Sequence, residues 1–531
     1  MMMVYRMAAA PGTLYLWVGL FNVPQPAMPV ASTSSAPVNV SIHSPLRAIR
    51  DGIADNDQHP LNHRVVFKLT GLANDQDAEI TIRSGTDLQT LRCRSLPAQV
   101  PWAMDGSFNI LLCSCYSQPD DGTGLLSKIV SAPHLRPDLT LMMGDQIYGD
   151  LPLFEDLPTD TPGLARKLGR KYLNNWRPMQ QGESGSGLSS VLSKAPSLCV
   201  ADDHEYWNNY PYRQYQLPKT YTAKGRAQWR AVAQALYQDY QLIDPALPID
   251  PEMDKVVFHN TALQVDPARP TLDVVHRLDI DPLKLLVVDL RSDRDPGYWQ
   301  KDFPVSAPHA QPFDSLVSPK VMAEMRRWAD DLLLAKQNRQ PAFGLFSSGQ
   351  AFLIPPAEEK DREKVDAEMA NYRQFNEQIM PIFEQLAAAD IPVVYITGDV
   401  HWGRLAQARQ SGSSHTTLHE VISSPSFVIH VAATDSFKLI GNSVRRLFGQ
   451  SDPWPRHPSV PQPPGKVGRL TLPQFDPEHG SGLRQRGDQI AMLSFRRAGA
   501  GIDFDVTYHA VTDNRKLPPQ QYSQTFSLRV L

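Results

Sequence analysis

Three short polar motifs in this chain each follow directly on a run of apolar residues. They are GDQIY at 144–148, ADDHEYWNN at 201–209 and GDVH at 398–401. A fourth apolar run, 108–113, leads into Ser114 and Cys115. Carboxylates, imidazoles and thiolates are the side chains that bind metal ions and transfer protons. The four motifs therefore indicate metal-assisted chemistry.

Apolar runs of this kind predict how the motifs are positioned. A strand whose side chains are all apolar is typical of a parallel sheet covered by helices on both faces. In such sheets, ligands bind just outside the carboxyl ends of the strands. A single Asp or His there is commonly a cap or a turn residue, but caps do not explain four such motifs together. We expect the sheet to gather the four motifs at one edge.

The composition is that of a large globular enzyme. The chain has 531 residues, 42% of them hydrophobic and 20% charged, with a formal net charge of −4. Its length predicts more than one domain. A slightly acidic chain offers no basic surface for a phosphate backbone, so we expect no nucleic-acid partner. The four cysteines do not form the pattern of a disulfide framework, and Cys115 lies where a thiolate can reach a metal.

The first residues superficially resemble a signal peptide, with Arg6 followed by an apolar run at 14–21. This run is too short to cross a bilayer, no twin arginine precedes it, and no clear cleavage site follows. Its aromatic residues instead favour a first β-strand. No later run approaches the length of a transmembrane segment. We therefore expect a cytoplasmic rather than a secreted protein.

The remaining pattern predicts two domains. Strand-like pieces at 64–69 and 78–82 indicate an Ig-like β-sandwich over residues 1–104. From 108 to about 450, strands alternate with amphipathic helices, which predicts an α/β catalytic domain over residues 105–531. The helices are expected at 224–240, 319–336 and 363–388, and further strands at 283–289, 342–346, 489–495, 502–508 and 525–531, the last three after a Pro-rich stretch at 453–464.

The ordered set Ser114-Cys115, GDQIY, DDHE with the following Asn-Asn, and GDVH resembles the PhoD-like (alkaline phosphatase D) metallophosphatases. The resemblance spans most of the chain. It implies a calcineurin-like core of two packed mixed β-sheets flanked by helices, with an N-terminal β domain. It also implies hydrolysis of phosphate mono- or diesters, in which a metal-activated hydroxide attacks phosphorus.

The metal-ligating residues divide into two kinds. Asp145 has two carboxylate oxygens with which to bridge metals, while Asp203 and Asp399 supply oxygens that suit calcium, magnesium or manganese. Cys115, Tyr148 and His401 form a softer set that favours trivalent iron. The resemblance implies the same pairing of iron with calcium. If Tyr148 is only a surface aromatic residue, zinc or manganese fits better.

The second motif also supplies groups for catalysis and substrate binding. Asp203 and His204 are the predicted catalytic residues: in an extended segment, His204 points away from Asp203 and toward the leaving group, which it would protonate. The alternative is that His204 only orients a neighbouring group. Glu205 is expected to fix its neighbours. Asn208, Asn209 and Arg291 are candidate substrate-binding residues, and the choice between the two asparagines as a metal ligand stays open.

Two other functions compete with phosphate ester hydrolysis. A non-catalytic protein of the same fold would hold a ligand on an aromatic rim formed by Tyr206, Trp207, Tyr210 and Tyr212. A glycosidase with paired carboxylates would need no metal. The intact set of metal-ligating residues favours the hydrolase, whose expected substrate is a small-molecule or lipid-like phosphate ester. The sequence does not predict the oligomeric state.

Overall fold

The computed structural model describes most of the chain. The described residues are 1–23, 25–51, 62–74, 76–151, 157–178, 187–211, 217–243, 271–294, 315–353, 369, 372–401, 403–410, 416–427, 475–477, 483–485, 488–511 and 521–529. Tyr212, the first part of the helix expected at 363–388 and the Pro-rich stretch at 453–464 lie outside them.

The larger sheet has ten strands in the order β21-β20-β19-β8-β9-β10-β1-β2-β5-β4. Strands β8, β9, β10 and β1 run parallel to one another, and the other pairs are antiparallel. Their bounds are β1 Met2–Ala8, β2 Thr13–Leu20, β4 Asn39–Ala48, β5 His63–Thr70, β8 Phe108–Cys113, β9 Leu139–Met143, β10 Ser197–Val200, β19 Gln489–Ala498, β20 Gly501–Ala510 and β21 Gln521–Leu528.

The second sheet has eight strands in the order β11-β12-β13-β14-β16-β15-β17, with β18 also pairing with β15. Strands β12, β13, β14 and β16 are parallel. Their bounds are β11 Val275–Ile280, β12 Leu283–Val288, β13 Phe343–Ser347, β14 Val393–Thr397, β15 Gly403–Gln410, β16 Thr416–Ile422, β17 Phe475–Pro477 and β18 Leu483–Gln485.

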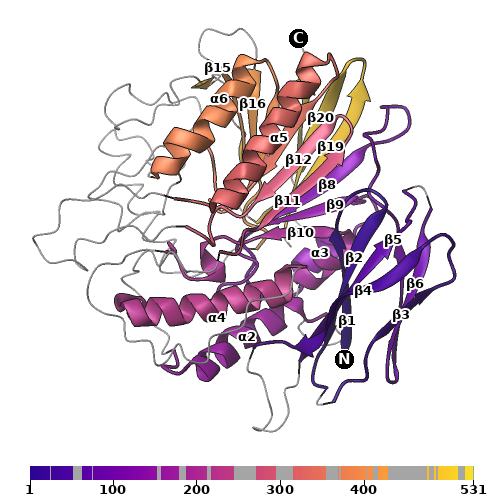
Figure 1. Cartoon of the computed structure of the whole chain (residues 1–531), viewed down its shortest axis with the longest axis vertical. Helices are drawn as coiled ribbons and strands as arrows, with labels where there is room; N and C mark the ends of the chain where they lie inside the picture. Colours follow the sequence, from indigo (N-terminus) through magenta and orange to yellow (C-terminus); the bar gives the residue numbers. More distant parts are fainter. Residues whose placement is uncertain are drawn as a thin grey trace, which may run out of the picture.

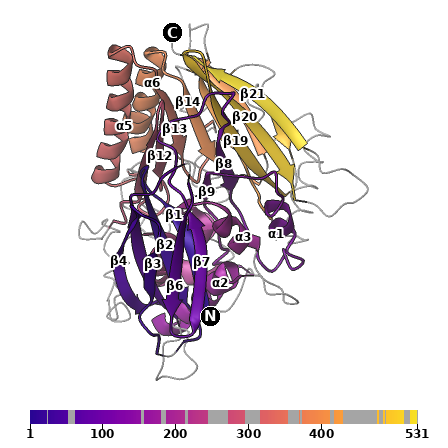
Figure 2. The same cartoon turned by 90° about the vertical axis from the view of Figure 1, so that its right-hand side faces the viewer.

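Helices cover the outer faces of both sheets. They are α1 Leu125–Val130, α2 Thr161–Trp176, α3 Gly187–Lys194, α4 Ala223–Gln241, α5 Pro319–Gln337 and α6 Met380–Ala388, with short helical turns at Asp203–Glu205, Pro218–Tyr221 and Phe375–Ile379. Figure 2 shows α5 and α6 on the outer face of β12, β13 and β14, with β8, β19, β20 and β21 on the opposite face. Helices α2 and α4 lie at the other side of the molecule (Figure 1).

The side chains of β8 show why its sequence is apolar throughout. Ile110 and Leu112 pack between the two sheets, against residues of the second sheet such as Leu345. Leu111 and Cys113 point to the opposite face, where they join the core that helices α1 to α4 cover. A strand buried on both faces has no place for the polar residues of an amphipathic strand. The prediction of a mixed α/β fold with several sheets is confirmed.

The N-terminal strands share a sheet with the rest of the molecule. Strand β1 pairs in parallel with β10, with Met7 opposite Ser197, so β1, β2, β5 and β4 continue the ten-stranded sheet. A separate three-stranded sheet of β3 Val30–Thr33, β6 Ala78–Ser84 and β7 Asp87–Cys93 packs on these strands through a common apolar core. The boundary at residue 104 stays a prediction.

The expected elements mostly coincide with observed ones. The apolar run at 14–21 is strand β2, and residues 224–240 and 319–336 lie in α4 and α5. Ser318 caps α5, because its side chain accepts a hydrogen bond from the Val321 amide and Pro319 begins the helix. Within the described residues, no helix combines the length and apolar character needed to cross a bilayer.

Candidate metal centre

The carboxyl ends of four parallel strands meet at one place in the fold. Cys115 follows β8, Asp145 follows β9 and Asp203 follows β10, all in the larger sheet; Asp399 and His401 follow β14 of the second sheet. Backbone hydrogen bonds join the turns, since the amide of Cys115 donates to Gly144 and that of Ser426, after β16, donates to Ser114. The four motifs converge as the sequence predicted, but they do so at the facing ends of two sheets and not at the edge of one sheet.

The candidate ligands form three overlapping groups. They are Cys115, Asp145 and His401; Asp145, Asp203 and His204; and Asp202, Asp203 and Asp399. Within each group, the potential ligand atoms all lie within 4.8 Å of one another. Asp145 and Asp203 each belong to two groups. The three groups are therefore linked to one another by shared carboxylates.

The backbone of the centre is unusual. Five of the nine described non-glycine residues with positive φ lie here: Cys115 (54°), Asp145 (56°), Asn209 (61°), Asp399 (65°) and His401 (58°). Residues other than glycine rarely adopt this left-handed backbone conformation, because their Cβ atom then crowds the backbone and raises its energy. Such conformations cluster at functional sites, where the surrounding structure holds them.

Two glycines let the strand ends approach closely. A Cβ at Gly144, whose φ is 84°, would lie 2.3 Å from the Cβ of Asp202. A Cβ at Gly398 would lie 2.3 Å from the Ser114 hydroxyl oxygen. Glycine at these positions therefore brings the turns after β8, β9, β10 and β14 into direct contact.

The softer ligands cluster as the sequence predicted. The Cys115 thiol donates to Asp145 Oδ2 over 3.3 Å, and Tyr148 Oη lies 3.3 Å from His401 Nε2. Tyr148 is buried, so it is not the surface aromatic residue of the alternative interpretation. Ser424, which the sequence analysis missed, donates to the Cys115 sulfur over 3.2 Å. It follows β16, and no metal-ligand motif marks it.

The electrostatics of these groups fit a bound cation. Burial raises the pKa of Asp145 well above its usual range, and the charge of Asp203 adds to the shift. Burial likewise raises the pKa of the Cys115 thiol and of the Tyr148 hydroxyl. A cation among them would stabilise their charged forms and reverse these shifts. Thiol, phenol, imidazole and carboxylate donors gathered in this way match a mixed metal centre.

His204 is held by a carboxylate that the sequence analysis did not identify. Its Nδ1 lies 2.7 Å from Oδ1 of buried Asp150, and the backbone amide of His204 donates to Asp145. Burial alone would lower the pKa of His204, but the charges of Asp150, Asp203 and Asp145 raise it well above its ordinary value. Asp150 lies just beyond GDQIY, and its spacing alone gave no reason to pair it with His204.

The three candidate substrate-binding residues occupy different positions. The amide of Asn208 donates to Asp150, and that of Asn209 donates to Asp203 over 2.6 Å. Both asparagine backbones thus support the centre. Arg291 is buried and donates to the Asp202 carboxylate and to the carbonyl of Tyr210. Its substrate-binding role stays a prediction, and its described contacts are those of a support beneath the site.

The aromatic rim of the competing hypothesis is wrong for the residues described. Tyr206, Trp207 and Tyr210 are 0%, 1% and 1% exposed. Their rings pack together, and Trp207 also contacts Trp229 of α4 with ring centroids 5.5 Å apart. These large side chains form core because α4 covers them, so they offer no surface to a ligand.

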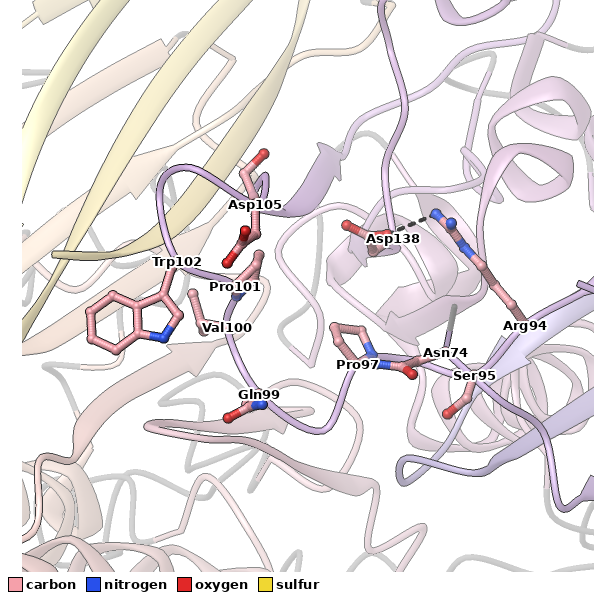
Figure 3. A pocket seen from close by; sticks show the side chains of 11 residues that line it. Asn74, Arg94, Ser95, Pro97, Gln99, Val100, Pro101, Trp102, Asp105 and Asp138 are labelled. Atoms are coloured by element: carbon pink, nitrogen blue, oxygen red, sulfur yellow. Dashed lines mark hydrogen bonds and ion pairs between the residues drawn. The ribbon is translucent and has the colours of Figure 1, made fainter. Parts of the chain in front are cut away.

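A pocket of about 300 Å³ lies away from the candidate metal ligands. Its lining includes Arg94, Trp102, Asp105 and Asp138, and Arg94 forms an ion pair with Asp138 (Figure 3). Asp138 immediately precedes β9, whereas Asp145 follows it, so the pocket and the candidate metal ligand Asp145 lie at opposite ends of that strand. The pocket contributes none of the residues described above.

Comparisons with known proteins place the chain in a family. Among solved structures, it is similar to GAP50, the anchor in the inner membrane complex of Plasmodium, at 7% identity over 80% of this chain and 90% of that chain, with a TM-score of 0.32. It is also similar to the protein TT1561 of Thermus thermophilus, at 9% identity over 60% and 90%, with a TM-score of 0.21. Likeness this low says nothing about function, and no curated protein matches. The model of the PhoD-like phosphatases, however, matches residues 108–430, which hold every candidate metal ligand, and the chain therefore belongs to the PhoD-like phosphatase family.

Proposed function

We propose that this protein is a metal-dependent hydrolase of phosphate monoesters or diesters. The observation that carries the proposal is the overlap of three ligand groups through Asp145 and Asp203. Membership of a phosphatase family supports the same reaction. The proposed substrate is a small-molecule or lipid-like ester, and a cytoplasmic location remains the expectation from the sequence. The proposal includes a calcineurin-like core and a β-sandwich-type N-terminal region.

We propose that the three groups provide two metal subsites, which differ in the cations that they suit. Cys115, Tyr148 and His401 would hold iron, with Asp145 shared between the subsites. Asp203 and Asp399 would hold calcium, magnesium or manganese. One oxygen of Asp202 already accepts from Arg291, so Asp202 is the weaker candidate ligand. When bound, such ions lower the pKa of water and neutralise the charge of a phosphate group.

His204 is proposed to protonate the leaving oxygen. Asp150 accepts from Nδ1 and so fixes the ring, which assigns proton transfer to Nε2. The side chain of His204 is 12% exposed, whereas that of Asp150 is 0% exposed. The imidazole is thus the exposed member of the pair, and a group that contacts substrate must be exposed. The buried carboxylate of Asp150 raises the pKa of the imidazole.

Leaving-group dependence tests this assignment. His204→Ala is expected to retain metal and to reduce turnover roughly a hundred- to ten-thousandfold for alkyl phosphate esters. Nitrophenyl esters should lose much less, because nitrophenolate departs without a proton. Turnover of both esters and metal content are measured on the same preparation. Equal losses with metal retained would indicate phosphate positioning, and loss of metal would make His204 a ligand.

Purified protein provides the test of the metals themselves. Prepared without chelator, it should contain iron and a hard divalent ion, and a visible charge-transfer band should disappear in Tyr148→Phe if the phenolate binds ferric iron. A colourless, metal-free protein with full esterase activity would refute the proposed centre.

A further inference from the structure

Glu205 lies beneath the two loops that carry most of the candidate ligands in the larger sheet. It is 1% exposed and ends the short helical turn at Asp203–Glu205. We propose that Glu205 is the positioning residue that clamps the loop after β9 to the loop after β10 and thereby sets the spacing of the metal ligands. This inference rests on the proposed function, since it assigns the clamp to the same centre.

The carboxylate of Glu205 accepts backbone hydrogen bonds from both loops. Oε2 accepts from the amide of Asp145 and from that of Asp202, each over 2.9 Å. Oε1 accepts from the amide of Gln146 over 2.7 Å. All three partners are N–H donors, so an ionised carboxylate, which only accepts, matches them fully.

The clamped amides belong to the residues that matter most for ligand spacing. Asp145 is shared by two ligand groups, and Asp202 immediately precedes Asp203, the other shared residue. The link is reciprocal, because the side chain of Asp202 accepts from the backbone amide of Glu205. If the clamp loosens, the oxygens of Asp145 and Asp203 lose their fixed separation.

Helix α4 holds the clamp from behind. Gln241, the last residue of α4, donates through Nε2 to Glu205 Oε1 and to the hydroxyl of Tyr172, both over 3.4 Å. The end of α4 is fixed in turn by buried Arg64 of β5, which donates to the carbonyls of Gln238, Asp239 and Leu242 over 2.7, 2.9 and 3.2 Å. A chain of contacts thus runs from an N-terminal strand to the metal-bearing loops.

Cobalt binding tests the clamp without any esterase assay. Glu205→Gln keeps the shape but turns an N–H₂ group toward backbone donors, so we expect Co²⁺ to bind roughly ten- to a hundredfold more weakly to metal-free protein. The binding is followed through the visible Co²⁺ bands and the thiolate-to-cobalt band from Cys115. Asp121→Asn is the matched control, because Asp121 is also buried and accepts from two amides, those of Leu125 and Leu126, at the start of α1.

The outcomes separate the clamp from general destabilisation. Asp121→Asn should lower the melting temperature and leave Co²⁺ affinity within about twofold of the parent. If Glu205→Gln does not fold, Gln241→Met removes the donor behind Glu205 and should weaken Co²⁺ severalfold. Unchanged affinity in the Glu205 or Gln241 variant that folds, or an equal loss in Asp121→Asn, would overturn the clamp alone. A parent protein that binds no Co²⁺ would overturn both the clamp and the proposed metal centre.

Discussion

Asp145 links two of the three candidate ligand groups. Its carboxylate accepts from the Cys115 thiol through Oδ2 and from the His204 amide through Oδ1, and it belongs to two ligand groups. Its own backbone, at a φ of 56°, is held in a left-handed conformation. Asp145 thus combines a strained backbone with membership of two candidate ligand groups, so small changes to it should affect the whole centre.

Asp145→Asn tests that role. The amide keeps the shape and removes one negative charge, so we expect loss of at least one metal ion and a fall in turnover of about a hundredfold or more. Metal-to-protein ratio and turnover are the measurements. Asp138→Asn is the control, because Asp138 precedes the same strand at its other end. Normal metal content and turnover in Asp145→Asn would reduce Asp145 to a turn residue.

Asp150→Asn should separate orientation of His204 from metal binding. An asparagine oxygen can still accept from Nδ1, but it lacks the charge that raises the pKa of His204. We expect metal content to stay the same and turnover of alkyl esters to fall by on the order of ten- to a hundredfold, with a smaller fall for nitrophenyl esters. A loss identical to that of Asp145→Asn, with metal missing, would contradict this division of roles.

The candidate ligands and the supporting residue Glu205 were predictable from sequence, whereas the supports Asp150 and Ser424 were not. Cys115, Asp145, Asp203, Asp399 and His401 all follow apolar runs, and this local signal located them. Asp150 and Ser424 act through partners distant in the chain, with contacts to His204 and Cys115. Only the folded arrangement gives those pairs, because each carboxylate or hydroxyl has many equivalent copies in the sequence.

At the scale of elements, the turn after β9 depends on the absence of a side chain at Gly144. Alanine at this position would destabilise the fold in two ways. Its backbone would be strained at the positive φ of 84°, and its Cβ would lie only 2.3 Å from the Cβ of Asp202. Gly499 has a φ of 60° but no atom within 4 Å of a built Cβ. The two glycines therefore differ in the space around them, and both have a left-handed backbone.

We expect Gly499→Ala to lower the free energy of unfolding by about 1 kcal/mol, the cost of the left-handed backbone alone. Gly144→Ala should cost at least about 2 kcal/mol more and reduce metal content, because the loops after β9 and β10 must move apart. Denaturant unfolding and metal analysis measure both effects. Equal destabilisation by the two substitutions would show that the close contact between residue 144 and Asp202 does not contribute to the free energy of unfolding.

Prediction of strands succeeded where a run of apolar residues was clear. The run at 283–289 corresponds to β12, and 489–495 lies within β19. Helix α2 was not among the helices expected from the sequence, and its residues Gly163 and Gly169 have low helix propensity. Gly169 is required by tertiary packing, since a Cβ there would lie 2.2 Å from that of Asp51. Distant partners also explain why Tyr206, Trp207 and Tyr210 are buried and do not form the expected rim: Trp207 packs against Trp229 of α4.

At the scale of the whole molecule, acid stability should reflect a histidine buried between the sheets. His419 of β16 is 4% exposed and packs against Phe504 and Phe526. Burial lowers its pKa from 6.5 to about 4. The unfolded chain takes up a proton below about pH 6.5 and the folded chain only near pH 4, so the stability that this group contributes is lost as the pH falls through that window.

The size of this effect is up to about 3 kcal/mol, from roughly 1.4 kcal/mol for each unit of pKa difference. His419→Gln does not titrate and should make unfolding free energy less dependent on pH between about 6.5 and 4. The measurement is the difference between parent and variant unfolding curves across that range, which cancels the contribution of the carboxylates. Parallel curves would show that His419 titrates normally in the folded protein.

The layering of the molecule was predictable, whereas the continuity of its larger sheet was not. Alternation of apolar strands and amphipathic helices indicated sheets covered by helices. The pairing of β1 with β10 joins Met7 to Ser197, and no local pattern encodes a partner so distant in sequence. The prediction of a separate N-terminal sandwich followed from strand composition alone, which cannot tell an isolated sheet from an extension of a neighbouring one.

The place of β19 beside β8 has a consequence for biosynthesis. Leu493 pairs with Ile110, and β8 has β9 on its other side. Until the ribosome has synthesised the C-terminal strands, β8 must present unpaired amides and carbonyls along an apolar strand, the kind of edge that recruits other chains. Pairing over such a separation is also slow. Nascent chains stalled before residue 489 should therefore aggregate or require chaperones, although they already contain every candidate metal ligand.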